Sequence, residues 1–216
     1  MSDARMETSD NGYVFTAHWF EYNAKNLWER LIPQVKPQKI LEIGSFEGAS
    51  ACYLIDKLGP EYPLEIHCID SWEGGIEHQT RGVDMNSTEK LFHDNLRLAI
   101  AASPNPVDLV VHKERSDSAL AKLLSAGKAG YFDFIYVDGS HQAPDVLFDA
   151  VVGFKLLRIG GTMAFDDYLW AEPLPGGKDP LRMPKPAIDA FVNLNLRKLQ
   201  LLNAPCIQLY VQKIAD

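Results

Sequence analysis

Short apolar runs and longer amphipathic stretches alternate along most of this chain. The apolar runs cover residues 39–43, 64–69, 107–112, 132–137 and 161–165, and each is bounded by Gly, Pro or Asp. Helical periodicity occupies residues 49–58, 87–101, 116–125 and 143–157 between them. Continuous apolar runs suit parallel strands that are buried on both faces, and right-handed crossover helices connect such strands. The pattern predicts a single α/β domain with a Rossmann-like, doubly wound and mostly parallel sheet.

The two ends of the chain depart from this alternation. Residues 1–16 are predicted to be a flexible tail, and residues 17–32 form an amphipathic N-terminal helix that Pro33 stops, ahead of a Rossmann-like core over residues 39–214. After a helix near residues 186–194, strands at 199–202 and 207–214 are separated by only a few residues, so they must pair as an antiparallel hairpin. Two connections, residues 71–86 and 168–185, are too long for simple turns and are expected to be functional or mobile loops.

Composition narrows the class of protein. The 216 residues are 46% hydrophobic, enough for one sizeable core, and the formal net charge of −8 comes without a basic tract that could bind a nucleic acid. No apolar run is long enough to cross a membrane, and the polar first residues do not resemble a secretory signal. Three well-separated cysteines, Cys52, Cys68 and Cys206, are expected to be buried thiols rather than disulfide partners. We therefore expect a cytoplasmic protein that has no nucleic-acid or membrane partner.

The first strand runs directly into a glycine turn and a helix. Gly44 and Gly48 are spaced G-x-x-x-G, and Glu42 stands two positions before the first glycine. This spacing lacks the third glycine of pyrophosphate-binding turns, so it favours a ligand whose ammonium group pairs with a carboxylate. The alternative is a tight strand-to-helix turn without a ligand. The second strand ends at Asp70, about 22 residues beyond Gly48, where a carboxylate can accept both ribose hydroxyls or act as a loop cap.

Acidic residues follow the fourth and fifth strands. Asp138 ends the fourth, and Asp166 and Asp167 end the fifth. Adjacent parallel strands lie about 5 Å apart, so the three carboxylates should converge and repel one another unless a cation sits between them. Hard oxygen ligands of this kind suit Mg²⁺ or Ca²⁺. In the alternative interpretation one acid is solvated and the other caps a turn.

His141 lies three residues after Asp138, at the predicted start of a helix. A histidine of ordinary pKa is well matched to removing a proton at neutral pH, which makes His141 a candidate general base beside Asp138. Histidines at helix starts also serve as capping or packing residues.

Taken together, these motifs resemble the class I S-adenosylmethionine-dependent methyltransferases, and most closely their small metal-assisted O-methyltransferases. The resemblance covers residues 39–214. It implies a cofactor site that holds the methionine portion near the glycine turn, the ribose at Asp70 and the adenine beside Trp72. The implied cofactor residues are Glu42, Gly44, Ser45, Gly48, Asp70, Ser71, Trp72, Ser116, Asp117 and Asp138. Ser116 is equally suited to be the N-cap of the following helix.

The resemblance also implies a divalent cation, Mg²⁺ or another, held by Asp138 together with Asp166 and Asp167. Known versions of this site use an Asp-Asn or a His-Asp pair, so the Asp-Asp pair here leaves open which of the two acids is the ligand. The expected reaction is methyl transfer to a hydroxyl oxygen of a small molecule. A metal-independent O- or N-methyltransferase, a dehydrogenase that uses NAD and a non-catalytic small-molecule-binding domain are the alternatives.

The sequence does not identify the methyl acceptor or the oligomeric state. Lys178, Arg182 and Lys185 in the second long connection suggest either an anionic acceptor or a solvated loop. Aromatic residues of the N-terminal helix could face a second subunit, giving a homo-oligomer, or could pack in the core. They are Trp19, Phe20, Tyr22 and Trp28.

Overall fold

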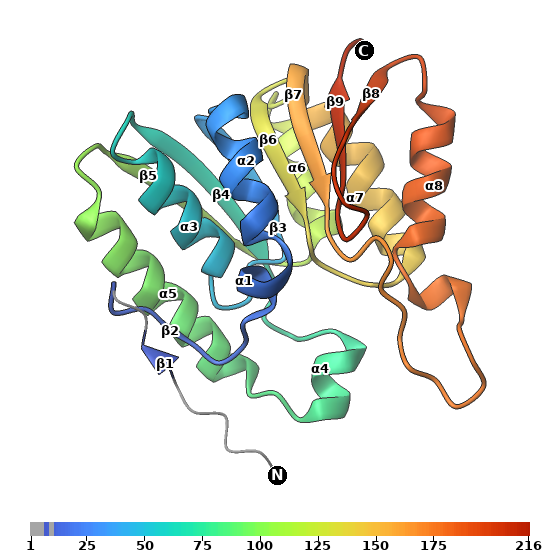
Figure 1. Cartoon of the computed structure of the whole chain (residues 1–216), viewed down its shortest axis with the longest axis horizontal. Helices are drawn as coiled ribbons and strands as arrows, with labels where there is room; N and C mark the ends of the chain where they lie inside the picture. The colour runs from blue at the N-terminus through green and yellow to red at the C-terminus, as the bar shows by residue number, and fades with distance from the viewer. Residues whose placement is uncertain (1–6, 9–10) are drawn as a thin grey trace.

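The computed structural model describes residues 7–8 and 11–216, and a seven-stranded sheet runs through the centre of this part of the chain (Figure 1). Across the sheet the strands follow the order β5-β4-β3-β6-β7-β9-β8. Their bounds are β3 (Lys39–Ile43), β4 (Leu64–Asp70), β5 (Val107–Lys113), β6 (Phe132–Val137), β7 (Leu157–Phe165), β8 (Leu199–Leu202) and β9 (Leu209–Lys213). The order reverses between β3 and β6, as in a doubly wound fold, which confirms the predicted fold class.

The C-terminal strands form the expected antiparallel hairpin. Strands β3 to β7 pair in parallel, whereas β9 pairs antiparallel with both β7 and β8. The hairpin thus enters the sheet through its second strand, with Leu209 opposite Phe165. Cys206, in the loop between β8 and β9, is exposed, so the expectation of a buried thiol is wrong for this cysteine and holds for Cys52 and Cys68.

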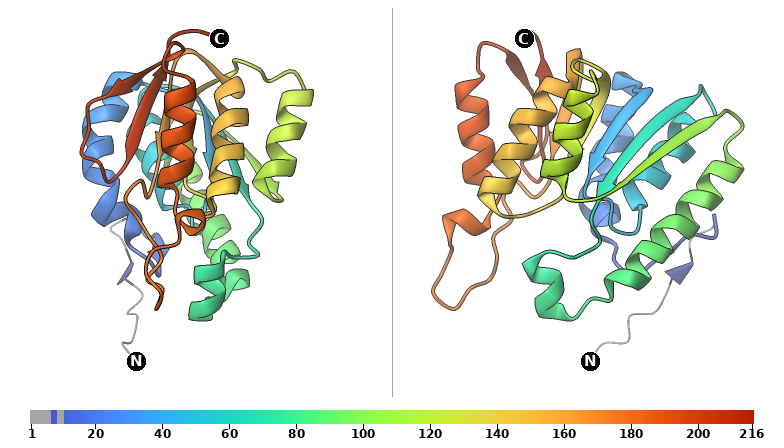
Figure 2. Two further views of the ribbon diagram at one scale, coloured as in Figure 1. Left: turned by 90° about the vertical axis from the view of Figure 1, so that its right-hand side faces the viewer. Right: turned by 180° about the vertical axis from the view of Figure 1, so that it is seen from behind.

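Helices cover both faces of the sheet (Figures 1 and 2). On one face lie α2 (Lys25–Val35), α3 (Ala49–Leu58) and α5 (Met85–Ala102), and on the other lie α6 (Ser116–Ser125), α7 (Ala143–Leu156) and α8 (Lys185–Leu194). Each face has its own apolar core, represented by Trp28 and Phe92 on the first and by Phe154 and Phe191 on the second. No helix of the described residues combines the length and the apolar character needed to cross a membrane.

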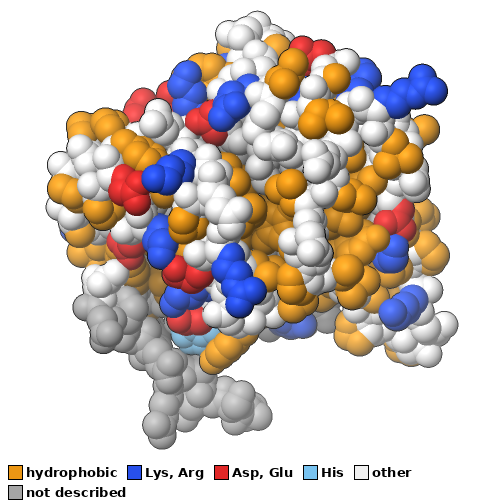
Figure 3. Space-filling view, turned by 45° about the horizontal axis from the view of Figure 1, so that its top comes forward, with side chains coloured by type: hydrophobic (Ala, Val, Ile, Leu, Met, Phe, Trp, Pro, Cys, Tyr) orange, Lys and Arg blue, Asp and Glu red, His pale blue; other side chains and the backbone are white. Residues whose placement is uncertain are grey.

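The outer surface mixes charges of both signs. Figure 3 shows Lys and Arg side chains beside Asp and Glu over the half of the molecule that carries α2, α3 and α5, while apolar side chains gather over the half with the C-terminal hairpin. Ion pairs such as Lys57–Glu29 and Lys36–Glu61 account for part of this mixture. The face in view therefore presents no continuous basic surface to a nucleic acid.

The N-terminal helix differs from its prediction in two ways. It is split into α1 (Trp19–Asn23) and α2, which meet at Ala24. It also passes Pro33 and ends only at Val35, where Lys36 takes a left-handed conformation with φ 45° and donates its amide to the Ile32 carbonyl. A proline in the last turn removes a single backbone hydrogen bond, so the helix tolerates it there. Trp28 is completely buried, which shows that this part of the aromatic face packs in the core.

The segment before α1 is anchored to the domain over residues 13–16. Asn95 on α5 exchanges two hydrogen bonds with the backbone of Val14, at 2.9 Å each, and the buried Glu47 accepts the amide and the hydroxyl of Thr16. Residues 1–6 and 9–10 of the predicted flexible tail lie outside the described residues. Of its described part, the stretch next to α1 is held by side chains of the glycine turn and α5, and β1 (Glu7–Thr8) pairs with β2 (Val14–Phe15).

Both long connections contain short helices that the sequence pattern does not predict. The first contains α4 (Ile76–Arg81), and the second contains a single 3-10 turn, η1 (Pro180–Arg182). Each has too few residues for helical periodicity to be visible.

A buried lysine joins the C-terminal hairpin to α7. The ammonium group of Lys213 on β9 donates to the carbonyls of Phe154 and Leu157, at 3.0 and 2.9 Å, at the end of that helix. Asp216 accepts from the same ammonium at 2.7 Å. The last carbonyls of a helix lack intrahelical partners, and a cation is favourable there, so Lys213 fixes the hairpin against the preceding helix.

A hydrogen bond joins the imidazoles of two histidines on the neighbouring strands β4 and β5. Nδ1 of His67 on β4 lies 2.9 Å from Nε2 of His112 on β5, and Nε2 of His67 lies 2.9 Å from Glu65. Burial lowers the pKa of both histidines. Burial also acts to raise the pKa of Glu65, but hydrogen bonds from Tyr131, His67 and Lys128 outweigh it and lower that pKa to about 2.

The histidine pair predicts a loss of stability in mild acid. Because both pKa values are lowered in the folded state, the unfolded chain takes up protons first, and the free energy of unfolding should fall as the pH drops below about 6.5. Urea unfolding between pH 8 and pH 5 measures this slope. Replacing one partner, as in His112→Gln, should reduce the slope, whereas His93→Gln on the exposed side of α5 should not. Equal slopes in all three proteins would contradict the assignment.

Candidate active site

A cavity of about 620 Å³ opens at the carboxyl ends of the central strands. Backbone hydrogen bonds hold these ends in order, because Gly44 donates to Ile69, Asp138 to Ile43 and Asp166 to Val137, at 2.8 to 3.0 Å. The cavity thus lies where the strand order reverses, which is the usual ligand site of an open α/β sheet. Residues that line it include Trp19, Gly44, Ser45, Phe46, Ser50, Asp70, Ser71, His78, Ser116, Asp138, His141, Asp166, Asp167 and Trp170.

The two glycines of the turn have different tasks. Gly44 takes φ 85°, and a Cβ there would lie 2.1 Å from the carbonyl oxygen of Asp138. Gly44 therefore lets the ends of β3 and β6 approach each other at the cavity wall. Gly48 takes φ 82°, but a Cβ there would meet Leu96 of α5 at 2.3 Å, and Gly48 is not among the lining residues. The structure explains Gly48 by helix packing rather than by ligand contact.

Glu42 lies below the cavity wall rather than in it. Only 1% of this residue is exposed, Ser50 donates its hydroxyl to the carboxylate, and the thiol of Cys68 lies 3.5 Å away. Burial raises the pKa of Glu42. The lining residue at this place is Ser50, so a direct pair between Glu42 and a ligand ammonium, as the sequence suggested, is not what the structure presents.

Asp70 stands at the end of β4 and lines the cavity. Its carboxylate accepts the amides of Ser45 and Phe46, at 3.0 and 2.9 Å, and that of Trp72 at 2.8 Å. It therefore fixes the glycine turn against the second strand end, and Ser71 lines the cavity beside it. Trp72 has φ 50° and packs on Phe92. It is 6% exposed and lies outside the cavity lining, although the resemblance implied that it flanks the adenine.

Ser116 and Asp117, both implied as cofactor residues, separate in the structure. Ser116 begins α6 and lines the cavity, and the helix N-cap is Arg115 rather than Ser116. Ser116 lies beside Asp149 of α7, a buried carboxyl whose pKa burial raises to about 7. Asp117 is exposed, accepts the amide of Ser118 at 2.7 Å and does not line the cavity. Ser116 stays a candidate cofactor residue, and Asp117 is a surface residue of the helix.

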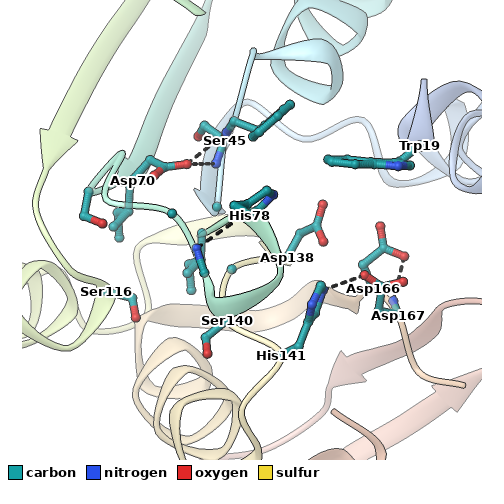
Figure 4. A pocket seen from close by; sticks show the side chains of 18 of the residues that line it. Trp19, Ser45, Asp70, His78, Ser116, Asp138, Ser140, His141, Asp166 and Asp167 are labelled. Carbon is teal, nitrogen blue, oxygen red and sulfur yellow. Dashed lines mark hydrogen bonds and ion pairs between the residues drawn. The ribbon is translucent and has the colours of Figure 1, made fainter. Parts of the chain in front are cut away.

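At the opposite end of the cavity, Asp138, His141 and Asp167 converge (Figure 4). One donor atom from each lies within 4.8 Å of the others, and Nε2 of His141 is 2.8 Å from the Asp167 carboxylate. Asp166 turns to another partner, because it accepts the hydroxyl of Tyr136 and the amide of Asp167. The structure thus brings His141 together with Asp138 and Asp167, whereas Asp166 does not belong to this group.

The cluster concentrates negative charge. Burial raises the pKa of Asp138, and the carboxylates of Asp166 and Asp167 raise it further. Burial and Asp167 raise the pKa of Asp166 as well. Like charges held this close favour a bound cation or a shared proton.

Aromatic residues that the sequence did not single out as ligands also surround the cavity. The ring of Trp170 packs against His141 with centroids 4.1 Å apart. Trp19 of α1 packs on Phe46 of the glycine turn at 5.1 Å, and His78 of α4 stacks on Phe46 at 5.3 Å. Figure 4 shows His78 over the space between Asp70 and Asp138. No spacing signal marks these side chains, because they come from separate segments that only the fold brings together.

Comparison with known proteins agrees with this geometry. A family model described as a methyltransferase domain matches residues 41–168, more than half of the chain. A curated relative from Dictyostelium discoideum, named "Probable caffeoyl-CoA O-methyltransferase 3", is 22% identical over 161 residues. That match covers 74% of this chain and 54% of the relative, so the chain spans about half the length of the relative.

Solved structures share the fold. An O-methyltransferase from Bacillus cereus, solved with S-adenosylhomocysteine (SAH), has a TM-score of 0.59 and 18% identity, covering 87% of this chain and 79% of its own. The O-methyltransferase TomG from Streptomyces achromogenes, solved with S-adenosylmethionine (SAM), has a TM-score of 0.58 and 20% identity, covering 88% and 78%.

The sheet order, the C-terminal hairpin and the cavity at the switch point define a Rossmann-like protein of the methyltransferase type. Because the family model matches more than half of its length, this chain belongs to the methyltransferase domain family.

Because Gly44 lies so close to the backbone of Asp138, adding one methyl group at Gly44 is expected to lower the stability of the protein strongly. Gly44→Ala should destabilise the protein by about 2 kcal/mol or more beyond the cost of a left-handed alanine, because the obstructing atom is backbone and cannot rotate away. Gly82→Ala is the matched control, since Gly82 has φ 66° and open space around its Cβ position. Urea unfolding of both variants measures the difference. Equal losses would show that the strand ends separate easily.

Proposed function

We propose that this chain transfers a methyl group from SAM to a hydroxyl oxygen of a small-molecule acceptor. The observation that carries the proposal is a single cavity with a glycine turn and Asp70 at one end and the cluster of Asp138, His141 and Asp167 at the other. SAM supplies a methyl group on a positively charged sulfur. The cavity would place this group beside the acceptor, and positioning of two reactants accounts for much of the rate enhancement of such a transfer.

The residues of the first end fit the cofactor. A carboxylate has about four acceptor positions, and backbone amides use three of those on Asp70, which leaves capacity for a ribose hydroxyl. Gly44 and Ser45 expose backbone to the same space, and Ser50 offers a hydroxyl near the place where the methionine portion is expected. The two solved O-methyltransferases contain SAH and SAM, which supports the same assignment.

The residues of the second end fit a divalent cation. Two carboxylates and one imidazole converge within 4.8 Å, and the mutual repulsion of the carboxylates would be relieved by a cation. Carboxylate oxygen ligands suit both Mg²⁺ and Mn²⁺. A cation bound there would act as a Lewis acid that lowers the pKa of the acceptor hydroxyl. Asp138 and Asp167 are proposed as ligands, with Asp166 orienting Asp167 through its backbone amide.

His141 can act either as a general base or as a metal ligand, and each role excludes the other. Its Nε2 faces Asp167 at 2.8 Å, so Asp167 can hold the imidazole in a fixed orientation. As a general base, His141 takes the proton that leaves the acceptor hydroxyl. As a metal ligand, it contributes Nε2 as a neutral imidazole, so Nδ1 keeps its hydrogen and cannot act as the base.

This contact also supports a second candidate function, a metal-independent O-methyltransferase. A base whose orientation is fixed by a third group is a recurrent catalytic arrangement, and the pair of His141 and Asp167 has that form without any cation. In this alternative Asp138 shapes the cavity and does not act as a ligand.

Binding of Mn²⁺, followed by electron paramagnetic resonance or calorimetry, separates the two functions. We expect one bound Mn²⁺, and at least tenfold weaker binding in Asp138→Asn and Asp167→Asn, because each variant loses a charged ligand. Asp166→Asn should weaken binding much less, since Asp166 faces Tyr136, and the exposed Asp94→Asn serves as a control for overall charge.

Turnover provides the second readout. Activity should disappear in excess EDTA and return with Mg²⁺ if the metal-assisted function holds. Full activity in chelator, or no binding of Mn²⁺ to the unmodified protein, would favour the metal-independent function. His141→Ala should then slow turnover by about 10² to 10⁴, the usual contribution of a general base.

A further inference from the structure

A buried carboxyl group that the proposed function does not use lies behind the cavity wall. Asp149 on α7 is 1% exposed and is not a lining residue. Among the described residues, no donor stands in regular hydrogen-bond geometry to either of its carboxyl oxygens. Burying a carboxyl group without a full partner costs free energy, so the position of Asp149 calls for an explanation.

The hydroxyl of Ser116 faces this carboxyl group from the neighbouring helix. Ser116 is the first residue of α6, which packs beside α7. Burial raises the pKa of Asp149 to about 7, and the carboxylates of Asp145 and Asp117 act in the same direction. The Ser116 hydroxyl, as a hydrogen-bond donor, and the guanidinium of Arg115 act against this shift. Asp149 therefore gains or loses its charge near neutral pH, and Ser116 is in contact with that change.

The order of the strands places the purine of the cofactor at Ser116. Across the sheet, the cavity meets Ser116 after β5, Asp70 at the end of β4 and, beyond β3, Asp138 after β6. Asp70 is paired with Lys113 at the end of β5, shortly before Ser116. Figure 4 shows Ser116 on the same side of the pocket as Asp70, with Asp138 farther across. With the ribose at Asp70 and the methyl group near Asp138, the purine extends toward Ser116.

We propose that Asp149 is a positioning residue that determines whether the Ser116 hydroxyl offers the purine an acceptor or a donor. A serine hydroxyl has one hydrogen and two acceptor positions. Ionised Asp149 takes the hydrogen of Ser116, so the oxygen of Ser116 faces the cavity as an acceptor, which matches the amino group of adenine. Protonated Asp149 donates to Ser116 instead, and the hydroxyl hydrogen of Ser116 turns to the cavity. This inference rests on the proposed function, because it concerns recognition of the same cofactor.

Two ligands that differ only at the purine test the role of Asp149. SAH carries an amino group on carbon 6, whereas S-inosylhomocysteine carries a carbonyl oxygen there. Calorimetry measures the ratio of the two affinities on the same protein, and titrations at the far end of the cavity cancel from this ratio. At about pH 8.5 the ratio should favour SAH roughly tenfold, the effect of one buried polar group left unmatched. It should fall about tenfold toward pH 5.5, because Asp149 takes up a proton and Ser116 becomes a donor.

Substitutions assign the pH dependence of this ratio to the two residues. Asp149→Asn should abolish it, because an amide does not ionise in this range. Ser116→Ala should abolish it as well, even with Asp149 in place, because the hydroxyl that transmits the change is absent. Asp117→Asn is the matched control, since it removes a carboxylate from an exposed position of α6 outside the cavity lining, and it should keep the pH dependence.

The first measurement uses the unmodified protein, so it does not depend on the folding of a variant. A ratio that stays constant with pH would overturn the role of Asp149. Survival of the pH dependence in Asp149→Asn or Ser116→Ala, or its loss in Asp117→Asn, would do the same. Tight binding of SAH with a constant ratio would contradict this inference and leave the proposed function standing, whereas no binding of either ligand would count against both.

Discussion

The site depends on one close approach, that of the backbone of Gly44 to the backbone of Asp138. A side chain on Gly44 would lie 2.1 Å from the Asp138 carbonyl oxygen, so β3 and β6 can only be neighbours at their carboxyl ends if this position is glycine. The strand order reverses at the same place. The glycine turn, Asp70, the carboxylates after β6 and β7 and the start of α6 all reach one cavity as a consequence of this arrangement.

Hydrogen bonds within the protein determine which polar side chains near the cavity have a structural role and which can contact a ligand. Glu42 is occupied by Ser50, and Asp166 is occupied by Tyr136 and by the amide of Asp167. Asp138 and Asp167 remain directed into the cavity together with His141. In the second long connection, Arg182 is likewise paired with Glu172, and Lys185 with Asp189. Polar side chains that already have partners within the protein are thus distinguished from those that can bind a ligand.

Much of the fold could be predicted from the sequence, because strands buried on both faces have a strong apolar signal. Strands β3, β6 and β8 and helices α3 and α6 begin and end at the predicted residues. The break at Ala24, the passage of α2 beyond Pro33 and the short helix α4 were not predicted. These features depend on tertiary contacts or on too few residues to show a period.

The site was predictable at the strand ends and less so elsewhere. Asp70 ends β4, Asp138 follows β6 directly, and Asp167 is the second residue after β7. A parallel sheet brings such positions together. Gly48, Trp72 and Asp117 are close in sequence to residues that line the cavity, but Gly48 and Trp72 pack against α5 and Asp117 is exposed. The spacing of residues in the sequence does not encode the direction of a side chain after a turn. Trp19, His78 and Trp170 come from three separate segments, so no local pattern could identify them.

A calorimetric titration with SAM tests the central claim most directly. The account predicts one binding site, and a loss of about 1 to 3 kcal/mol in binding free energy for Asp70→Ala, the range for a charged hydrogen bond left unmade. Asp117→Ala should bind like the unmodified protein, since Asp117 is exposed and outside the cavity. No heat with SAM, together with a melting temperature that rises with NAD, would contradict the account.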